Sequence, residues 1–274
     1  VQQGRGQYHP STLDFRVADK NMELLDIKRD TLGNISQWIF SGSMSVYRAP
    51  SHEKLLLSTL NMLNYLSLGN IEDARVEARR LRISQQVLEG ADSADEAAIG
   101  IGSYLSAFSY EMSGRYEEAL QFYADAVRFG GYPASMPAIS QVADCTSYRN
   151  EQISAMLHEA VGVPGNAPCT LIGKNTGTIL VVPAMGFAPN KVPRRIPIGA
   201  AVVIAGAFLT PQLLADSNDF AIKGLLKWVN FPELTQSTPA YDRVTVWVDG
   251  KPNPTELGEN VSLLVKRSWD AVKG

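Results

Sequence analysis

The sequence has few of the residues on which metal sites and nucleic-acid interfaces depend. Among 274 residues there are two cysteines and three histidines, and their spacing suggests no zinc site. The 25 basic residues are scattered and are outnumbered by 28 acidic ones, which argues against a nucleic-acid-binding face. The longest apolar run, Ile198–Leu209, is too short to cross a bilayer. We therefore predict no metal or other cofactor and no nucleic-acid partner.

Catalytic motifs are also missing. Gly173–Gly177 superficially resembles a phosphate loop, but no Ser or Thr follows Lys174, so a hairpin turn explains it better. The chain has no Gly-x-Ser-x-Gly elbow. His158 lies beside Glu159 in a predicted helix without a nucleophile assigned to it, which favours a structural role. These absences predict a protein that is not an enzyme.

The two cysteines, Cys145 and Cys169, lie 24 positions apart and allow two interpretations. In an exported protein they can form a disulfide, which would stabilise the fold by roughly 3 kcal/mol. In a reducing compartment they would be two small buried side chains. The sequence does not show the compartment, so both alternatives stay open.

Two similar stretches, Gly69–Ala74 and Gly114–Ala119, organise the first half of the chain. In each, a Gly ends one apolar helical run, an acidic pair opens the next, and an Ala follows. Gly takes the left-handed conformation that ends a helix, and acidic residues in a first turn interact favourably with the helix dipole. The small Ala lets two antiparallel helices approach closely. This pattern is typical of helix–turn–helix repeats.

Both stretches resemble tetratricopeptide repeats. The residues of the second unit that match the repeat are Leu105, Phe108, Gly114, Tyr116, Ala119, Tyr123 and Ala126. Those of the first unit are Leu63, Leu66, Gly69, Ala74, Ala78 and Leu81. The equivalent alanines lie 45 residues apart (74 to 119), against ~34 in the usual repeat. The resemblance therefore implies divergent units with a longer linker at residues 88–95.

The order of elements predicts an α+β fold, in which tetratricopeptide-like helical hairpins precede a small mixed α/β domain. We expect a helical domain at residues 1–162 and a β-containing domain at 163–274, because composition changes at Gly162–Pro168. Helices are predicted at Leu13–Leu32, Ser51–Leu68, Ile71–Leu88, Asp95–Ser113, Tyr116–Phe129, Met136–Cys145, Asn150–Val161, Phe220–Val229 and Glu259–Val272. Strands are predicted at Cys169–Ile172, Thr178–Val182, Lys191–Ile198, Ala201–Phe208 and Arg243–Val248.

The whole chain resembles a family of bacterial envelope lipoproteins with a helical repeat half and a small C-terminal β-containing half. The matching stretches are Leu66–Arg80, Ser113–Ala119, Gly177–Val182, Gly186–Val192, Arg195–Ile198, Phe231–Leu234 and Val246–Gly250. The resemblance implies a periplasmic, outer-membrane-associated protein with a lipid anchor upstream of Val1. It also implies protein partners in the cell envelope and a homo- or hetero-oligomer.

The first candidate binding group lies on the inner helices of the repeats, and its amide and aromatic side chains suit an extended peptide. Its members are Asn61, Asn64, Tyr65, Tyr104 and Tyr110. The alternative is that the tyrosines pack between helices.

The second candidate group is Lys191, Arg194 and Arg195, on a Pro-flanked segment. These side chains either dock a partner or keep an edge strand soluble. A basic run at Arg75, Arg79, Arg80 and Arg82 is either a solvated helix face or a site for an acidic peptide or anionic polymer.

The sequence thus predicts a non-enzymatic protein-binding and assembly scaffold of the bacterial cell envelope. The alternative is an enzyme that processes an envelope polymer with His158 or an acid of the β domain as catalyst. A cytosolic adaptor is a third, weaker option.

Overall fold

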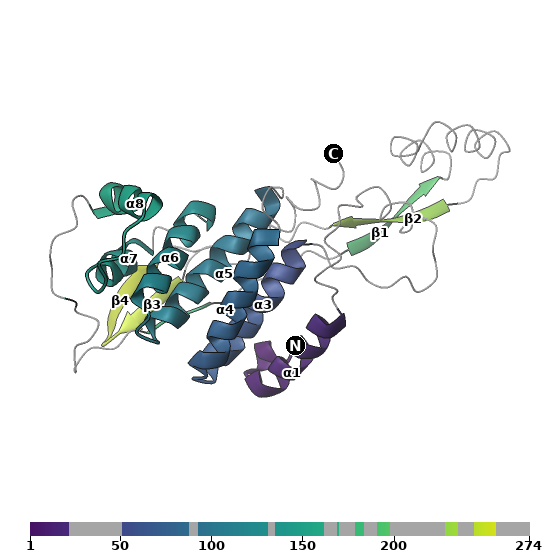
Figure 1. Cartoon of the computed structure of the whole chain (residues 1–274). Helices are drawn as coiled ribbons and strands as arrows, with labels where there is room; N and C mark the ends of the chain where they lie inside the picture. The colour runs from purple at the N-terminus through teal and green to yellow at the C-terminus, as the bar shows by residue number, and fades with distance from the viewer. Residues whose placement is uncertain are drawn as a thin grey trace, which may run out of the picture. The chain divides into compact units, whose positions relative to one another are not determined.

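A computed structural model describes residues 1–21, 51–87, 93–130, 135–161, 169, 179–183, 191–197, 228–234 and 244–255. Over these residues the chain is mostly helical, with two small antiparallel sheets of two strands each (Figure 1). The described elements fall into two units by contact. One holds the helices and the β3–β4 hairpin, and the other holds β1 and β2. The predicted domain boundary at Gly162–Pro168 lies outside the described residues and stays a prediction.

Over the described residues, the helices up to Val161 agree with the predicted ones to within a few residues, except at the N-terminus. The predicted helix Glu259–Val272 and the predicted strand Ala201–Phe208 lie outside the described residues. They are α1 (Tyr8–Asn21), α3 (Ser51–Ser67), α4 (Ile71–Val87), α5 (Ser93–Glu111), α6 (Tyr116–Gly130), α7 (Ser135–Ala143) and α8 (Glu151–Val161), with a short 3₁₀ helix at Gln3–Arg5. Helix α1 begins five positions before the predicted start at Leu13. The reason is that Ser11 and Thr12 are buried, so tertiary packing holds a first turn that has no apolar periodicity.

The two turns predicted from the repeated Gly have the same geometry. Gly69 ends α3 with φ of 71° and Gly114 ends α5 with φ of 69°, so both take the left-handed conformation. After α3, the N–H of Asn70 donates to Tyr65 O and that of Gly69 to Leu66 O, at 2.9 and 3.0 Å. The corresponding bonds after α5 have the same spacing. Each turn therefore closes its helix and reverses the chain into an antiparallel hairpin.

The core of the first unit lies between these hairpins. Helices α3, α4, α5 and α6 pack on one another, and α7 and α8 pack on α6 (Figure 1). The predicted close approach at alanine is confirmed, since Ala74, Ala78, Ala119 and Ala126 are each 0% exposed. A Cβ on Gly102 of α5 would lie 2.5 Å from Leu81 Cδ2. Small residues thus bring the helices of the two hairpins together.

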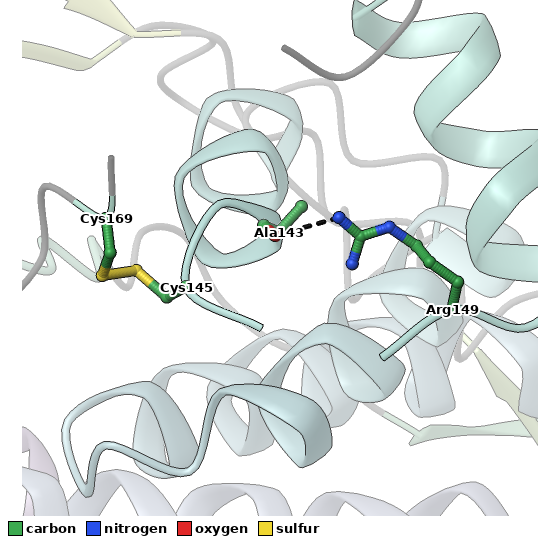
Figure 2. The surroundings of a disulfide bond; sticks show 4 residues. All are labelled: Ala143, Cys145, Arg149 and Cys169. Atoms are coloured by element: carbon green, nitrogen blue, oxygen red, sulfur yellow. Dashed lines mark hydrogen bonds between the residues drawn. A yellow bond between two sulfur atoms is a disulfide. The ribbon is translucent and has the colours of Figure 1, made fainter. Parts of the chain in front are cut away.

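A disulfide and one arginine hold the end of α7 (Figure 2). Cys145 follows α7 and is bonded to Cys169, so the bridge closes a loop that contains α8. The guanidinium of Arg149 donates a 3.0 Å hydrogen bond to Ala143 O, a carbonyl left open at the end of α7, and a 2.9 Å bond to Thr146 O, which lies beyond the helix.

The strands differ more from the prediction than the helices do. Strand β1 (Lys191–Pro197) pairs with β2 (Trp228–Leu234), and β3 (Val244–Val248) pairs with β4 (Lys251–Thr255). The predicted strands at Lys191–Ile198 and Arg243–Val248 are confirmed over β1 and β3. Residues 228–229 were predicted to end a helix but begin β2. Residues 179–182 lie outside any strand, so that prediction is wrong there.

None of the described helices has both the length and the apolar character that spanning a bilayer requires.

Candidate functional site

The helical residues predicted to bind a partner lie in or against the packed core. The exposed fractions of Asn61, Asn64, Tyr65 and Tyr110 are 1%, 0%, 6% and 6%. Tyr104 is half-buried against the core. The structure divides the five into two groups. Asn61, Asn64 and Tyr65 of α3 lie where α1 and α4 are bonded to α3, and the two α5 tyrosines contact α6.

Helix α1 binds the same side chains of α3 that the sequence assigns to partner recognition. Asn64 Nδ2 donates a 2.9 Å hydrogen bond to Ser11 Oγ, and Arg16 Nη2 donates a 3.0 Å bond to Tyr65 Oη. Asp19 forms an ion pair with Arg80 of α4. Ser11, Arg16 and Asp19 have no role that the sequence predicts. The sequence gives no signal for them, because α1 contacts α3 and α4 through polar side chains that follow no apolar repeat.

Beneath α1, a carboxylate joins α3 to α4. Asn61 Nδ2 donates a 2.8 Å hydrogen bond to Glu77 Oε1, and Arg80 Nη1 lies 3.4 Å from the same oxygen. Glu77 is 4% exposed. Burial raises the pKa of Glu77, although Arg80 and Asn61 oppose the rise. The contact therefore holds a carboxylate where the loss of hydration disfavours its charge.

Three acceptor atoms of this cluster are buried without a hydrogen-bond partner: Asn61 Oδ1, Asn64 Oδ1 and Glu77 Oε2. Buried acceptors normally have a donor, because their hydration is otherwise lost without compensation. Helix α1 thus covers this face of α3 and α4 without satisfying all of its polar groups.

The two tyrosines of α5 pack against α6. Tyr110 stacks on Phe122 with ring centroids 5.4 Å apart, and Tyr104 meets Tyr123 edge-to-face at 5.7 Å. Tyr123 Oη donates a 2.6 Å hydrogen bond to Glu111 Oε2, and both residues are buried. Burial raises the pKa of Glu111, and the bond from Tyr123 opposes that rise. The contacts agree with the packing alternative for these tyrosines, whose part in binding stays a prediction.

Much of the basic run on α4 is engaged within the helical unit. Arg75 pairs with Glu72 at 2.6 Å and lies over the ring of Tyr110, 6.0 Å from its centroid. Arg82 pairs with Asp125 at 2.9 Å and lies 4.2 Å from the ring centroid of Phe122. Since Arg80 contacts Asp19 and Glu77, Arg79 is the residue of the run that is exposed. The run is therefore mostly an internal network, which leaves little charge for an anionic polymer.

The second predicted group lies on β1, in the other unit. Lys191, Arg194 and Arg195 pair in register with Leu234, Phe231 and Asn230 of β2. The predicted strand is confirmed, and the role of these residues in docking a partner stays a prediction.

The described residues offer no built catalytic centre. His158, the catalyst of the enzyme alternative, is exposed near the end of α8. The cavity near α8 is an open depression of about 460 Å³ lined by Arg128, Asn150, Glu151 and Gln152. Within the described ranges, no group of three or more His, Cys, Asp or Glu side chains could hold a metal ion. Of the residues predicted to bind a partner, Asn61, Asn64 and Tyr65 lie together at the α1–α3–α4 contact.

In comparisons with known proteins, the chain had no significant match to a family model, a curated protein or a solved structure.

Proposed function

We propose that this protein is a non-enzymatic binding and assembly scaffold of the bacterial cell envelope, and that a partner helix binds the face of α3 and α4. The observation that carries the proposal is that α1, a helix of the same chain, is bound to that face through Asn64 and Tyr65. Both residues are among those that the sequence predicts to bind a partner. In this proposal α1 occupies the partner's site.

The chemistry of the α1 contact suits the exchange of one helix for another. The contacts of Ser11, Arg16 and Asp19 are polar, and two apolar residues of α1, Leu13 and Val17, are 48% and 62% exposed. Leu13 and Val17 bury little apolar area, so the removal of α1 costs less than that of a helix whose apolar side chains are all buried. A partner helix with Lys, Arg or amide side chains would supply the donors that the three unsatisfied acceptors lack.

The fold proposed for this function is α+β, with tetratricopeptide-like hairpins α3–α4 and α5–α6 followed by a small mixed α/β domain. The two left-handed turns, which have the same hydrogen-bond spacing, and the buried alanines support the repeat interpretation. A second contact surface on β1, formed by Lys191, Arg194 and Arg195, belongs to the same proposal.

The proposed location is the periplasm, with association to the outer membrane. The Cys145–Cys169 disulfide supports an exported protein, because disulfides persist in oxidising compartments and are rare in reducing ones.

Photo-crosslinking in an envelope extract tests this function. A photoreactive residue replaces Leu60, whose carbonyl accepts a bond from Gln3 at the edge of the α1 contact. The paired variant Arg16→Ala/Asp19→Ala removes two contacts of α1, and we expect it to raise the adduct yield several-fold. A synthetic peptide of residues 1–21 should suppress the adduct, because it competes for the same face.

Two controls make the result specific. Asp14→Ala changes an exposed residue of α1 and should leave the yield unchanged. The photoreactive residue placed at His158 on α8 should give no increase when α1 is weakened. An increase of equal size at both positions, or no adduct at position 60 in any variant, refutes binding at the α3–α4 face.

A further inference from the structure

Arg80 of α4 is shared by two carboxylates that come from different helices. Its Nη2 forms the ion pair with Asp19 of α1, and its Nη1 lies 3.4 Å from Glu77 Oε1. A hydrogen bond between a guanidinium and a carboxylate is normally about 2.7–2.9 Å long, so the contact with Glu77 is a long one. One cation therefore faces two anions, and its contact with the buried anion is weak.

The other contacts of Glu77 compensate its charge only in part. Asn61 Nδ2 donates to Oε1, but Oε2 is buried and has no donor in the part of the chain that the structure describes. Burial raises the pKa of Glu77, and the negative charge of Asp19 raises it further. A charged Glu77 is thus least well compensated when α1 places Asp19 beside the shared guanidinium.

The remaining charged groups at the contact do not replace this guanidinium. Arg16, which α1 also brings to α3, donates to Tyr65 Oη rather than to Glu77. Asp73 precedes Glu77 by one turn of α4 and adds negative charge, and the fields of both carboxylates raise the pKa of Arg16. The groups that α3 contributes to these bonds are uncharged amides and a hydroxyl. The charge of Glu77 is therefore balanced mainly by Arg80.

We propose that the charge of Glu77 controls the docking of α1 on α3 and α4, so that acid holds α1 in place and neutral pH favours its release. A proton on Glu77 removes its repulsion from Asp19 and leaves the whole guanidinium of Arg80 to Asp19. The inference rests on the proposed function, because it describes how the face that α1 covers becomes available to a partner.

The direction of the pH dependence follows from the two states of α1. When α1 is docked, burial and Asp19 raise the pKa of Glu77. When α1 leaves, Asp19 leaves with it and Arg80 can turn fully to Glu77, which lowers that pKa. The docked state thus holds the proton more tightly. Its stabilisation is complete below the pKa of the undocked state and is lost as pH rises through the pKa of the docked state.

Hydrogen exchange of the full chain, without any partner, tests the proposal. Helix α1 has 14 residues, and a helix of this length is marginal by itself, so its amides should exchange freely once it undocks. From about pH 5 to about pH 7.5, with intrinsic exchange rates divided out, we expect the protection of α1 to fall about threefold or more. In Glu77→Gln, which carries no charge at either pH, the protection should change little. Amides of α5 serve as the reference for opening of the whole helical unit.

Two further variants separate this coupling from other effects of pH. Asp19→Asn removes the second carboxylate, so the protection of α1 should be lower at both pH values and should vary less between them. Asp14→Asn changes an exposed carboxylate of the same helix and should keep the fall seen in wild type. An equal fall in wild type and Glu77→Gln, or no fall in wild type, overturns the proposal.

Photo-crosslinking at position 60, repeated at the same two pH values, distinguishes this failure from a failure of the proposed function. We expect more partner adduct at the higher pH. Loss of α1 protection at neutral pH without any partner adduct supports the pH-dependent docking of α1 and contradicts partner binding at its site. A partner adduct of equal yield at both pH values contradicts control by Glu77 and leaves the proposed function standing.

Discussion

Asn61 and Glu77 link the two helices of the first hairpin through a hydrogen bond of 2.8 Å from Nδ2 to Oε1. Both side chains are almost wholly buried, at 1% and 4% exposed. Glu77 thus keeps a carboxylate in a place where burial raises its pKa, with Arg80 and Asn61 as the groups that oppose the rise. A hairpin built for stability alone would have an apolar pair here, because removing both polar partners is often neutral or stabilising.

The titration of Glu77 should make the stability of the protein depend on pH. Because its folded pKa lies above the ordinary value of 4.5, the folded state holds the proton more tightly than the unfolded state. The contribution of this group to stability is therefore complete below about pH 4.5 and is lost as pH rises through the folded pKa. Glu77→Gln removes this dependence, so its free energy of unfolding should improve relative to wild type as pH rises from 4 to 7.

Denaturant unfolding at several pH values measures this difference. Asp14→Asn, a change at an exposed carboxylate in the middle of α1, is the matched control, and its difference in stability from wild type should vary less with pH than that of Glu77→Gln. A Glu77→Gln profile that runs parallel to wild type would show that burial does not perturb this carboxylate.

The buried pair Tyr123 and Glu111 should respond strongly to loss of its hydroxyl. In Tyr123→Phe the buried Glu111 loses a donor that is 2.6 Å away, which should cost about 1.5–3 kcal/mol of unfolding free energy at neutral pH. The loss should shrink in acid, since the bond lowers the pKa of Glu111 and its removal raises that pKa further. Tyr116→Phe, at a half-buried tyrosine of the same helix, is the comparison. Equal losses for the two variants would mean that the buried bond from Tyr123 to Glu111 adds no more unfolding free energy than the hydroxyl of Tyr116 does.

The helical hairpins were predictable because their signals are local. Gly69 and Gly114 mark the turns through backbone conformation alone, and Ala74 and Ala119 mark the contacts through size. The burial of Asn61 and Asn64 was not predictable in this way. It depends on Ser11 and Glu77, which approach from other helices, and polar residues at helical spacing look the same whether water or a neighbouring helix faces them.

The prediction of the strands is likewise limited by information that the sequence does not contain. β1 and β3 carry β-branched residues and were predicted, whereas β4 reads Lys-Pro-Asn-Pro-Thr and was missed. Proline within a run argues against a central strand, and this rule holds. Within the described residues β4 pairs only with β3, and Pro252 and Pro254 belong to pairs whose backbone nitrogens point away from β3. A sequence shows the proline but does not show on which side of the strand its nitrogen lies.

Two glycines of α5 should tolerate alanine to different degrees. A Cβ at Gly102 would lie 2.5 Å from Leu81 Cδ2, a side-chain atom, whereas one at Gly100 would lie 2.6 Å from Gly130 Cα. A side chain can turn aside, whereas Gly130 presents only backbone, so the end of α6 has to shift. We expect Gly102→Ala to destabilise the fold by about 1–3 kcal/mol, and Gly100→Ala to cost more. Thermal unfolding ranks the two, with Gly4→Ala, where a Cβ meets nothing within 4 Å, as the reference. A larger loss for Gly102→Ala would mean that the backbone at Gly130 is displaced at a lower cost than the side chain of Leu81.

The Cys145–Cys169 bridge should contribute strongly to stability (Figure 2). It closes a loop of 24 residues, and the chain-entropy effect of such a loop is about 3 kcal/mol. Cys145→Ser/Cys169→Ser should lower the free energy of unfolding by about that amount, and a reductant should lower that of the wild type equally while leaving the variant unchanged. A reductant that also destabilises the variant would act by some route other than this bond.

The same bond connects stability to location. Protein taken from its native host under alkylating conditions should carry no free thiol at either cysteine, because an exported chain meets an oxidising compartment before it is isolated. Mass spectrometry of the peptides that contain residues 145 and 169 distinguishes the two states. Two alkylated cysteines in freshly isolated protein would contradict the proposed periplasmic location. The serine variant would then lose little stability in the cell, since the wild type would lack the bridge there as well.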